Sequence, residues 1–167
     1  TKMFKKAKCI ITATGNGNIK DMCRSILLQI DAERVLKIIF FYLPASDSDY
    51  LQHNKELREC VKEHFPTATP LVSYVAQKPE CGALVAEVVS LADNYATIEH
   101  KSRYILLRKG NCCEIMSEGI IPADITASTF SQANDIFDTM GAILDENGFT
   151  PSDIYRQWNY IQGITVL

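Results

Sequence analysis

The chain has 167 residues, of which 47% are hydrophobic and 22% charged, and its formal net charge is −3. This composition excludes a disordered chain, and the weak negative charge argues against broad electrostatic binding to nucleic acid or to an anionic membrane. No apolar run approaches the length of a membrane span, and the lysine-rich start leads into only a short apolar patch, so we expect no spanning helix and no signal peptide.

The cysteine spacing predicts free thiols. None of the 6 cysteines forms a Cys-x-x-Cys pair, and the 3 histidines lie near no pair of cysteines in the sequence. We therefore predict no metal site, no bound cofactor and a cytoplasmic protein with reduced thiols.

The first half of the chain alternates predicted strands and helices. Strands are expected at 9–13, 35–43, 71–76 and 83–91, and helices at 19–30 and 47–64. The run 35–43 is rich in β-branched and aromatic residues, which is typical of a buried strand. The loop 77–82 is long enough to join the last two strands as an antiparallel hairpin.

A boundary is predicted at Asp93-Asn94, and the second half begins with strands at 97–99, 104–109 and 112–116. A turn at Lys109-Gly110-Asn111 would join the last two of these. A long amphipathic helix follows, with Ser128 or Thr129 as its cap and Asn147-Gly148 at its end. Its predicted apolar face consists of Phe130, Ala133, Phe137, Met140 and Leu144.

The last predicted element is a strand over 154–161. Alternate residues of a strand share one face, so Arg156, Trp158 and Tyr160 would lie together. A cation beside two aromatic side chains with polar tips fits a pocket for a planar, anionic small molecule. The same residue types are also enriched at subunit interfaces, and a pocket at an interface would satisfy both interpretations.

From about Val35 onward, the order of elements resembles the RidA (YjgF) superfamily of enamine/imine deaminases. The second half is similar to the front half of that family, and the first half to its back half. The segments that carry the resemblance are Glu118-Gly119-Ile120-Ile121-Pro122, Gln132-Ala133, Gly148, Phe65-Pro66 and Gly82-Ala83-Leu84-Val85. Two such units in tandem, with a Trp-x-Tyr-Ile segment, look most like the chorismatase-type branch.

The resemblance implies an α+β fold with RidA/chorismate-mutase-like sheets and helices packed on one face. Residues 1–93 would form a first unit, shortened at its start, and residues 94–167 the front half of a second unit that is cut near its middle. It also implies a homotrimer or pseudo-trimer with ligand pockets between neighbouring subunits.

The backbone around Gly119 matches a ligand-contacting Gly segment of the family, and Glu118 stands where the family usually has Ser. Together with Arg156 and Trp158 of the predicted strand, this backbone would bind a small carboxylate, and Glu118 and Tyr160 would act in catalysis. The family's carboxylate-binding Arg falls at about Pro70, so the first unit lacks it. The family's water-positioning Glu lies near Glu87, one residue out of step.

Two classes of function follow from these observations. The first is hydrolysis of an enamine or imine, or in a chorismatase-like reaction of an enol ether, in a small carboxylate metabolite. The alternative is a non-catalytic small-molecule-binding or structural module of a trimeric assembly. RNA cleavage, also attached to this family, is disfavoured by the acidic charge balance.

Overall fold

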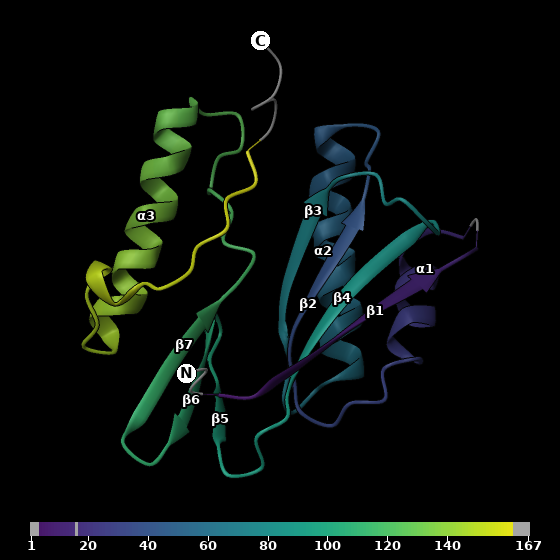
Figure 1. The fold of residues 1–167 in the computed structure, drawn as a ribbon. Helices are drawn as coiled ribbons and strands as arrows, with labels where there is room; N and C mark the ends of the chain where they lie inside the picture. The colour runs from purple at the N-terminus through teal and green to yellow at the C-terminus, as the bar shows by residue number, and fades with distance from the viewer. Residues whose placement is uncertain (1–3, 16, 162–167) are drawn as a thin grey trace. The chain divides into compact units, whose positions relative to one another are not determined.

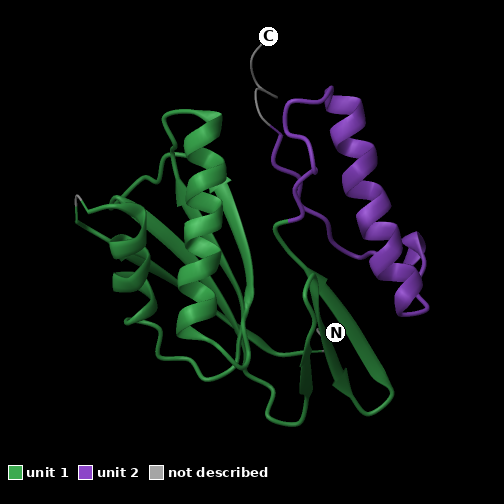
Figure 2. Cartoon of the chain, turned by 180° about the vertical axis from the view of Figure 1, so that it is seen from behind, with its two compact units in different colours: residues 1–119 green, residues 120–167 purple. Residues whose placement is uncertain are grey.

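The computed structural model describes residues 4–15 and 17–161, and the chain divides into two compact units, residues 1–119 and 120–167 (Figure 2). The first unit contains two β-sheets and two helices, and the second contains one long helix. The α+β class predicted from the sequence is confirmed. The boundary expected from the sequence at Asp93-Asn94 lies within the first compact unit and stays a prediction.

The larger sheet of the first unit has four strands in the order β1-β4-β2-β3. Strands β2 and β3 are parallel, and β4 lies antiparallel between β1 and β2. The strands are β1 (Lys6–Ala13), β2 (Val35–Tyr42), β3 (Leu71–Ala76) and β4 (Leu84–Leu91). A parallel pair needs a long return connection, which here contains helix α2 (Asp47–His64).

The predicted hairpin between β3 and β4 is wrong. The loop 77–82 instead carries the chain past β2, and β4 pairs with β1 along the whole of Lys6–Ala13 and with β2 on its other side. In this position β4 satisfies the backbone groups of two neighbouring strands. Pairing with β3 at the edge of the sheet would satisfy those of only one.

Both helices of the first unit cover the same face of this sheet (Figure 1). Helix α1 (Ile19–Leu27) begins after Asn18, whose side-chain oxygen accepts a hydrogen bond from the Asp21 amide at 2.9 Å. The core between helices and sheet includes the fully buried side chains of Ile26, Ile38, Phe40, Leu57, Val61 and Leu84.

A smaller antiparallel sheet completes the first unit. Its strands are β5 (Thr97–His100), β6 (Tyr104–Lys109) and β7 (Cys112–Ser117). The predicted turn between β6 and β7 is confirmed, because Gly110 adopts a φ of 57° at the first position of the two-residue loop. A second core cluster contains side chains from both sheets, among them Leu36, Leu71, Ile105 and Leu107. This shared core makes the two sheets one compact unit.

Asp93 lies buried in the connection between the two sheets. Its carboxylate accepts hydrogen bonds from Lys109 Nζ at 2.7 Å and from the Tyr95 amide at 3.1 Å. The hydrogen bond from Lys109 is the main cause that holds the pKa of Asp93 below its ordinary value. The hydrogen bond from the Tyr95 amide and the positive charge of Arg34 lower this pKa further, whereas burial raises it. Arg34 also donates to the carbonyl oxygens of Asp93 and Ala96.

We expect acid to destabilise the first unit through Asp93. A carboxyl group has a pKa of about 3.9 in an unfolded chain, and that of Asp93 is lower in the folded one. The contribution of Asp93 to stability is therefore complete at a pH above its pKa in the unfolded chain. It is lost as the pH falls through its pKa in the folded chain. Denaturant unfolding of the wild type and of Asp93→Asn between about pH 3 and pH 7 measures this loss.

Asp93→Asn should show a shallower loss of stability in acid than the wild type does. The matched control is Asp31→Asn, at an exposed position of the same unit. Equal acid sensitivity of Asp93→Asn and the wild type would contradict the prediction.

The second unit is built on helix α3 (Thr129–Glu146). Ser128 caps the helix as predicted, with its hydroxyl accepting from the Ser131 amide at 3.2 Å. Gly148 adopts a φ of 70° just past the helix end, and a 3₁₀ turn, Pro151–Asp153, follows. None of the described helices has the length and apolarity needed to cross a membrane.

One prediction for the second unit is wrong. Residues 154–161 form no strand, because residues 120–161 contain no other strand with which to pair. On the predicted apolar face of α3, Phe137, Met140 and Leu144 line one groove, while Phe130 and Phe137 are 76% and 55% exposed. The helix buries only Ile143 among its described residues, because this unit contains no sheet for the helix to cover.

Candidate functional site

The predicted site residues Glu118 and Gly119 follow directly after β7 and are fixed to the larger sheet. Glu118 forms an ion pair with Lys37 of β2, and the two side chains are only 20% and 14% exposed. The Gly119 carbonyl accepts a hydrogen bond from Arg58 Nη2 of α2 at 3.0 Å. Gly119 has a φ of 63°, and a Cβ atom there would overlap the Val72 carbonyl oxygen of β3.

These contacts limit what the segment can do chemically. The Glu118 carboxylate has Lys37 as its partner, so it can exchange a proton with a ligand only if that ion pair opens. Arg58 is held in turn by Asn54, whose side-chain oxygen accepts from Arg58 Nε at 3.1 Å. Burial lowers the pKa of Arg58, and the nearby Tyr50 partly offsets this effect. The segment is therefore an ordered part of the first unit.

The other predicted site residues, Arg156, Trp158 and Tyr160, belong to the second unit. Trp158 and Tyr160 are 69% and 59% exposed, and the Arg156 guanidinium carbon lies 5.9 Å from the centroid of the Trp158 ring. This cation–π contact forms without the predicted strand. Glu118 and Gly119 lie in the first unit, so neither unit by itself contains all five predicted residues.

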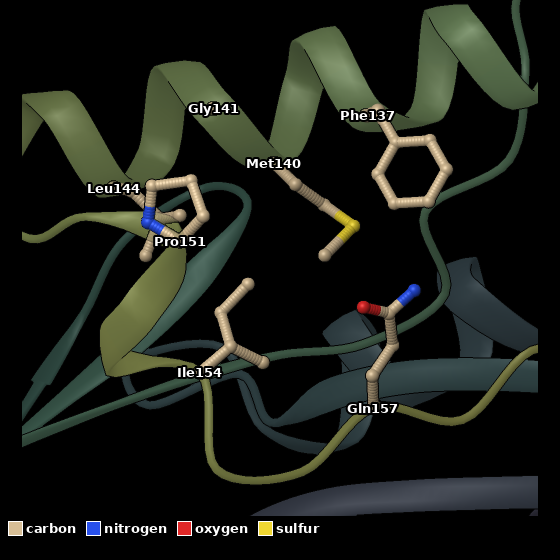
Figure 3. A pocket seen from close by; sticks show the side chains of 7 residues that line it. All are labelled: Phe137, Met140, Gly141, Leu144, Pro151, Ile154 and Gln157. Atoms are coloured by element: carbon tan, nitrogen blue, oxygen red, sulfur yellow. The ribbon is translucent and has the colours of Figure 1, made fainter.

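A groove of about 500 Å³ lies within the second unit, between α3 and the segment after it (Figure 3). Side chains of Phe137, Met140 and Leu144 from the helix line it, with Ile154 and Gln157 opposite. The side chains that line the groove are apolar except for that of Gln157, and none of them is ionisable. The groove offers packing surface and has no group suited to acid–base chemistry.

A cleft of about 440 Å³ lies within the first unit, and its lining is polar as well as apolar. It is formed by the segment before β2, the α2–β3 connection and β5, and we name it the Arg34–His100 cleft. The lining includes Glu33, Arg34, Phe65, Thr67, Ile98 and His100. The His100 Nδ1 atom lies 3.0 Å from the Thr69 carbonyl oxygen. A carbonyl can only accept, so Nδ1 donates and Nε2 remains for other contacts.

Sequence reasoning did not find Arg34 or His100. They lie on segments that are distant in the sequence and match no motif, and the antiparallel pairing of β5 with β6 sets the position of His100.

An aromatic cluster lies between α2 and the parallel strands. Tyr50 stacks on Tyr74 with ring centroids 4.8 Å apart, and His53 packs edge-on against Tyr42 at 5.4 Å. Burial is the main cause that raises the pKa of Tyr74, which keeps its phenol protonated. His53 is half-buried in this cluster.

The cysteines differ in burial, and Cys9 and Cys81 are exposed. Cys23 and Cys60 are buried between α1 and α2, and burial raises the pKa of both thiols. Cys112 and Cys113 occupy adjacent positions on β7, with Cys112 the more exposed. Residues 4–15 and 17–161 contain no group of three or more His, Cys, Asp or Glu side chains arranged to hold a metal ion.

Comparisons with known proteins give no match: no protein-family model, no curated protein and no solved structure corresponds to this chain.

Proposed function

We propose that this chain is a RidA/YjgF-like protein that binds a small carboxylate metabolite. The observation that carries the proposal is the strand order β1-β4-β2-β3, with a parallel β2–β3 pair and both helices on one face. This arrangement supports the resemblance of the first half, in which a strand, a helix, Phe65-Pro66 and a strand precede a last strand that opens after Gly82. The family assignment itself is part of the proposal.

The elements after Asp93 support the same proposal in their order along the chain. The β5–β7 strands, the segment Glu118-Gly119 and the helix α3 follow one another as the front half of a second such unit would. A tandem of two units is what the chorismatase-type resemblance implies.

The proposed ligand contacts are those that the sequence indicates. Arg156 and Trp158 would hold the carboxylate and a planar body, and the backbone at Gly119 would contribute polar contacts. We also propose a homotrimer or pseudo-trimer, as the family resemblance implies.

The proposed reaction is hydrolysis. In an imine, water adds to the imine carbon, and nitrogen leaves as ammonia to give the oxo acid. In an enol ether, a general acid protonates the double bond before water adds, and the alcohol then leaves. Glu118 and Tyr160 are the proposed acid–base groups for either reaction.

A second candidate is a binding or structural module without catalysis. The observation in its favour is that Glu118 is paired with Lys37 and that the Gly119 carbonyl is bonded to Arg58. Both residues therefore already have roles in stability. The absence of a cation at Pro70 points in the same direction.

The test is ligand-induced thermal stabilisation combined with a turnover assay. We expect phenylpyruvate and benzoate to raise the melting temperature saturably, because a ligand that binds only the folded chain stabilises it. Arg156→Gln should weaken the affinity for these acids about tenfold or more, and so reduce the rise in melting temperature, because the loss of a charged hydrogen bond costs about 1.5–3 kcal/mol. Arg24→Gln, at an exposed position on α1, is the matched control.

The outcomes separate the candidates. Binding together with release of ammonia from an imine, or hydrolysis of chorismate, supports the enzyme. Binding without either reaction supports the module. Absence of binding by both acids would contradict the carboxylate proposal, and a monomer in light scattering would contradict the trimeric one.

A further inference from the structure

The lining of the Arg34–His100 cleft includes both a cation and an anion, Arg34 and Glu33. Arg34 bonds two carbonyl oxygens, of Asp93 and Ala96, and forms no ion pair among the described residues. A guanidinium has five N–H donors, so these two bonds leave further donors for a ligand. The charge of Arg34 lowers the pKa of Asp93, whose carboxylate accepts a hydrogen bond from Lys109.

Glu33 supplies the opposite charge in the same cleft. Its side chain is exposed, lines the cleft beside Arg34 and forms no ion pair within residues 4–15 and 17–161. A cation and an anion that are not paired with each other, in one concave site, are complementary to a ligand with both charges. The cleft volume of about 440 Å³ is within the usual range for small-molecule sites.

The remaining lining adds an apolar wall and neutral polar groups. Phe65 and Ile98 offer hydrophobic contact, and the Thr67 hydroxyl and His100 Nε2 offer hydrogen bonds. The bond between His100 Nδ1 and the Thr69 carbonyl oxygen, at 3.0 Å, fixes the orientation of the imidazole. A ligand that matches all of these groups has a carboxylate, an ammonium and an apolar side chain.

We infer that the Arg34–His100 cleft binds a free α-amino acid with an apolar side chain. The carboxylate contacts the remaining N–H donors of Arg34, the ammonium contacts Glu33, and the side chain packs against Phe65 and Ile98. This site is separate from the carboxylate site proposed above, and it does not depend on that proposal.

The experiment is calorimetric titration of the full chain with three probes. L-phenylalanine has both charges, 3-phenylpropionate lacks the ammonium, and phenethylamine lacks the carboxylate. We expect L-phenylalanine to bind saturably and each of the other two to bind about tenfold more weakly or less, since each loses one charged contact. Equal affinity for L-phenylalanine and 3-phenylpropionate, or no binding of L-phenylalanine, would overturn the inference.

A variant assigns the binding to the cleft. Glu33→Gln should lower the affinity for L-phenylalanine about tenfold and leave the affinity for 3-phenylpropionate unchanged, because only the contact with the ammonium is lost. Glu80→Gln makes the same charge change at an exposed position outside the cleft and should bind like the wild type. Unchanged affinity of Glu33→Gln for L-phenylalanine would refute the site. Carboxylate binding that is sensitive to Arg156→Gln but not to Glu33→Gln belongs to the other proposal.

Discussion

Gly119→Ala should destabilise the first unit by about 3–5 kcal/mol. Two effects add at this position. An alanine at a φ of 63° is in the left-handed region, which costs about 1–2 kcal/mol for a residue with a Cβ atom. The new Cβ would also overlap the Val72 carbonyl oxygen, and the backbone of β3, which is hydrogen-bonded to β2, cannot move aside as a flexible side chain can. The Arg58 guanidinium, which bonds the Gly119 carbonyl at 3.0 Å, would be displaced as well.

Gly110→Ala provides the matched control for Gly119→Ala. Gly110 also has a positive φ, of 57°, but no atom lies within 4 Å of the place its Cβ would occupy. It should therefore lose only the conformational part, about 1–2 kcal/mol. Urea unfolding of the two variants and the wild type measures both effects. Equal losses for the two substitutions would show that the segment after β7 is not held against β3 as described.

The second large effect is expected from breaking the Lys37–Glu118 ion pair. Glu118→Gln should cost about 2–3 kcal/mol, because it leaves the ammonium of Lys37 without its partner at a position that is only 14% exposed. Lys37→Met should cost a similar amount, because it leaves the Glu118 carboxylate without its ion-pair partner. The double variant should be more stable than the sum of the two losses predicts, since neither charge then remains.

The exposed pair Lys101–Glu99 is the control for this double-mutant cycle. Its side chains are 48% and 43% exposed, so Lys101→Met should change the free energy of unfolding by less than about 1 kcal/mol. The same variants bear on function. A stability loss in Glu118→Gln that the double variant recovers supports a structural role. Unchanged stability with loss of hydrolysis would support Glu118 as a catalytic residue and contradict the expectation of a stabilising pair.

The predicted elements that hold in the structure depend on local sequence. The segment 71–76 is a strand with the predicted bounds, and 47–64 is a helix with the predicted bounds. Helix caps at Asn18 and Ser128 and the turn at Gly110 also follow from the residue types alone. In each case the preference comes from interactions within a few residues of the chain.

The incorrect predictions concern interactions between distant segments. The alternation of Arg156, Trp158 and Tyr160 is typical of a strand, yet a strand forms only beside another, and residues 120–161 contain none. The loop 77–82 has the length of a hairpin loop, but β4 pairs with β1 and β2 instead. Local pattern indicates that a segment can be extended and does not select its partner.

The candidate sites show the same division. Glu118 and Gly119 were found from a resemblance in sequence, but their bonds to Lys37 and Arg58 depend on how β7 ends against the larger sheet. Glu33, Arg34 and His100 were not found, because the cleft that they line is assembled from three separate segments.

The sequence by itself determined the α+β class, the helix caps and the tight turns. These depend on backbone conformations and short-range hydrogen bonds that a residue and its neighbours decide. Only the tertiary structure decided the strand order β1-β4-β2-β3, the common core of the two sheets and the charges gathered in the Arg34–His100 cleft. The physical reason is that strand pairing and burial depend on which distant surfaces meet, and many pairings satisfy the same local pattern.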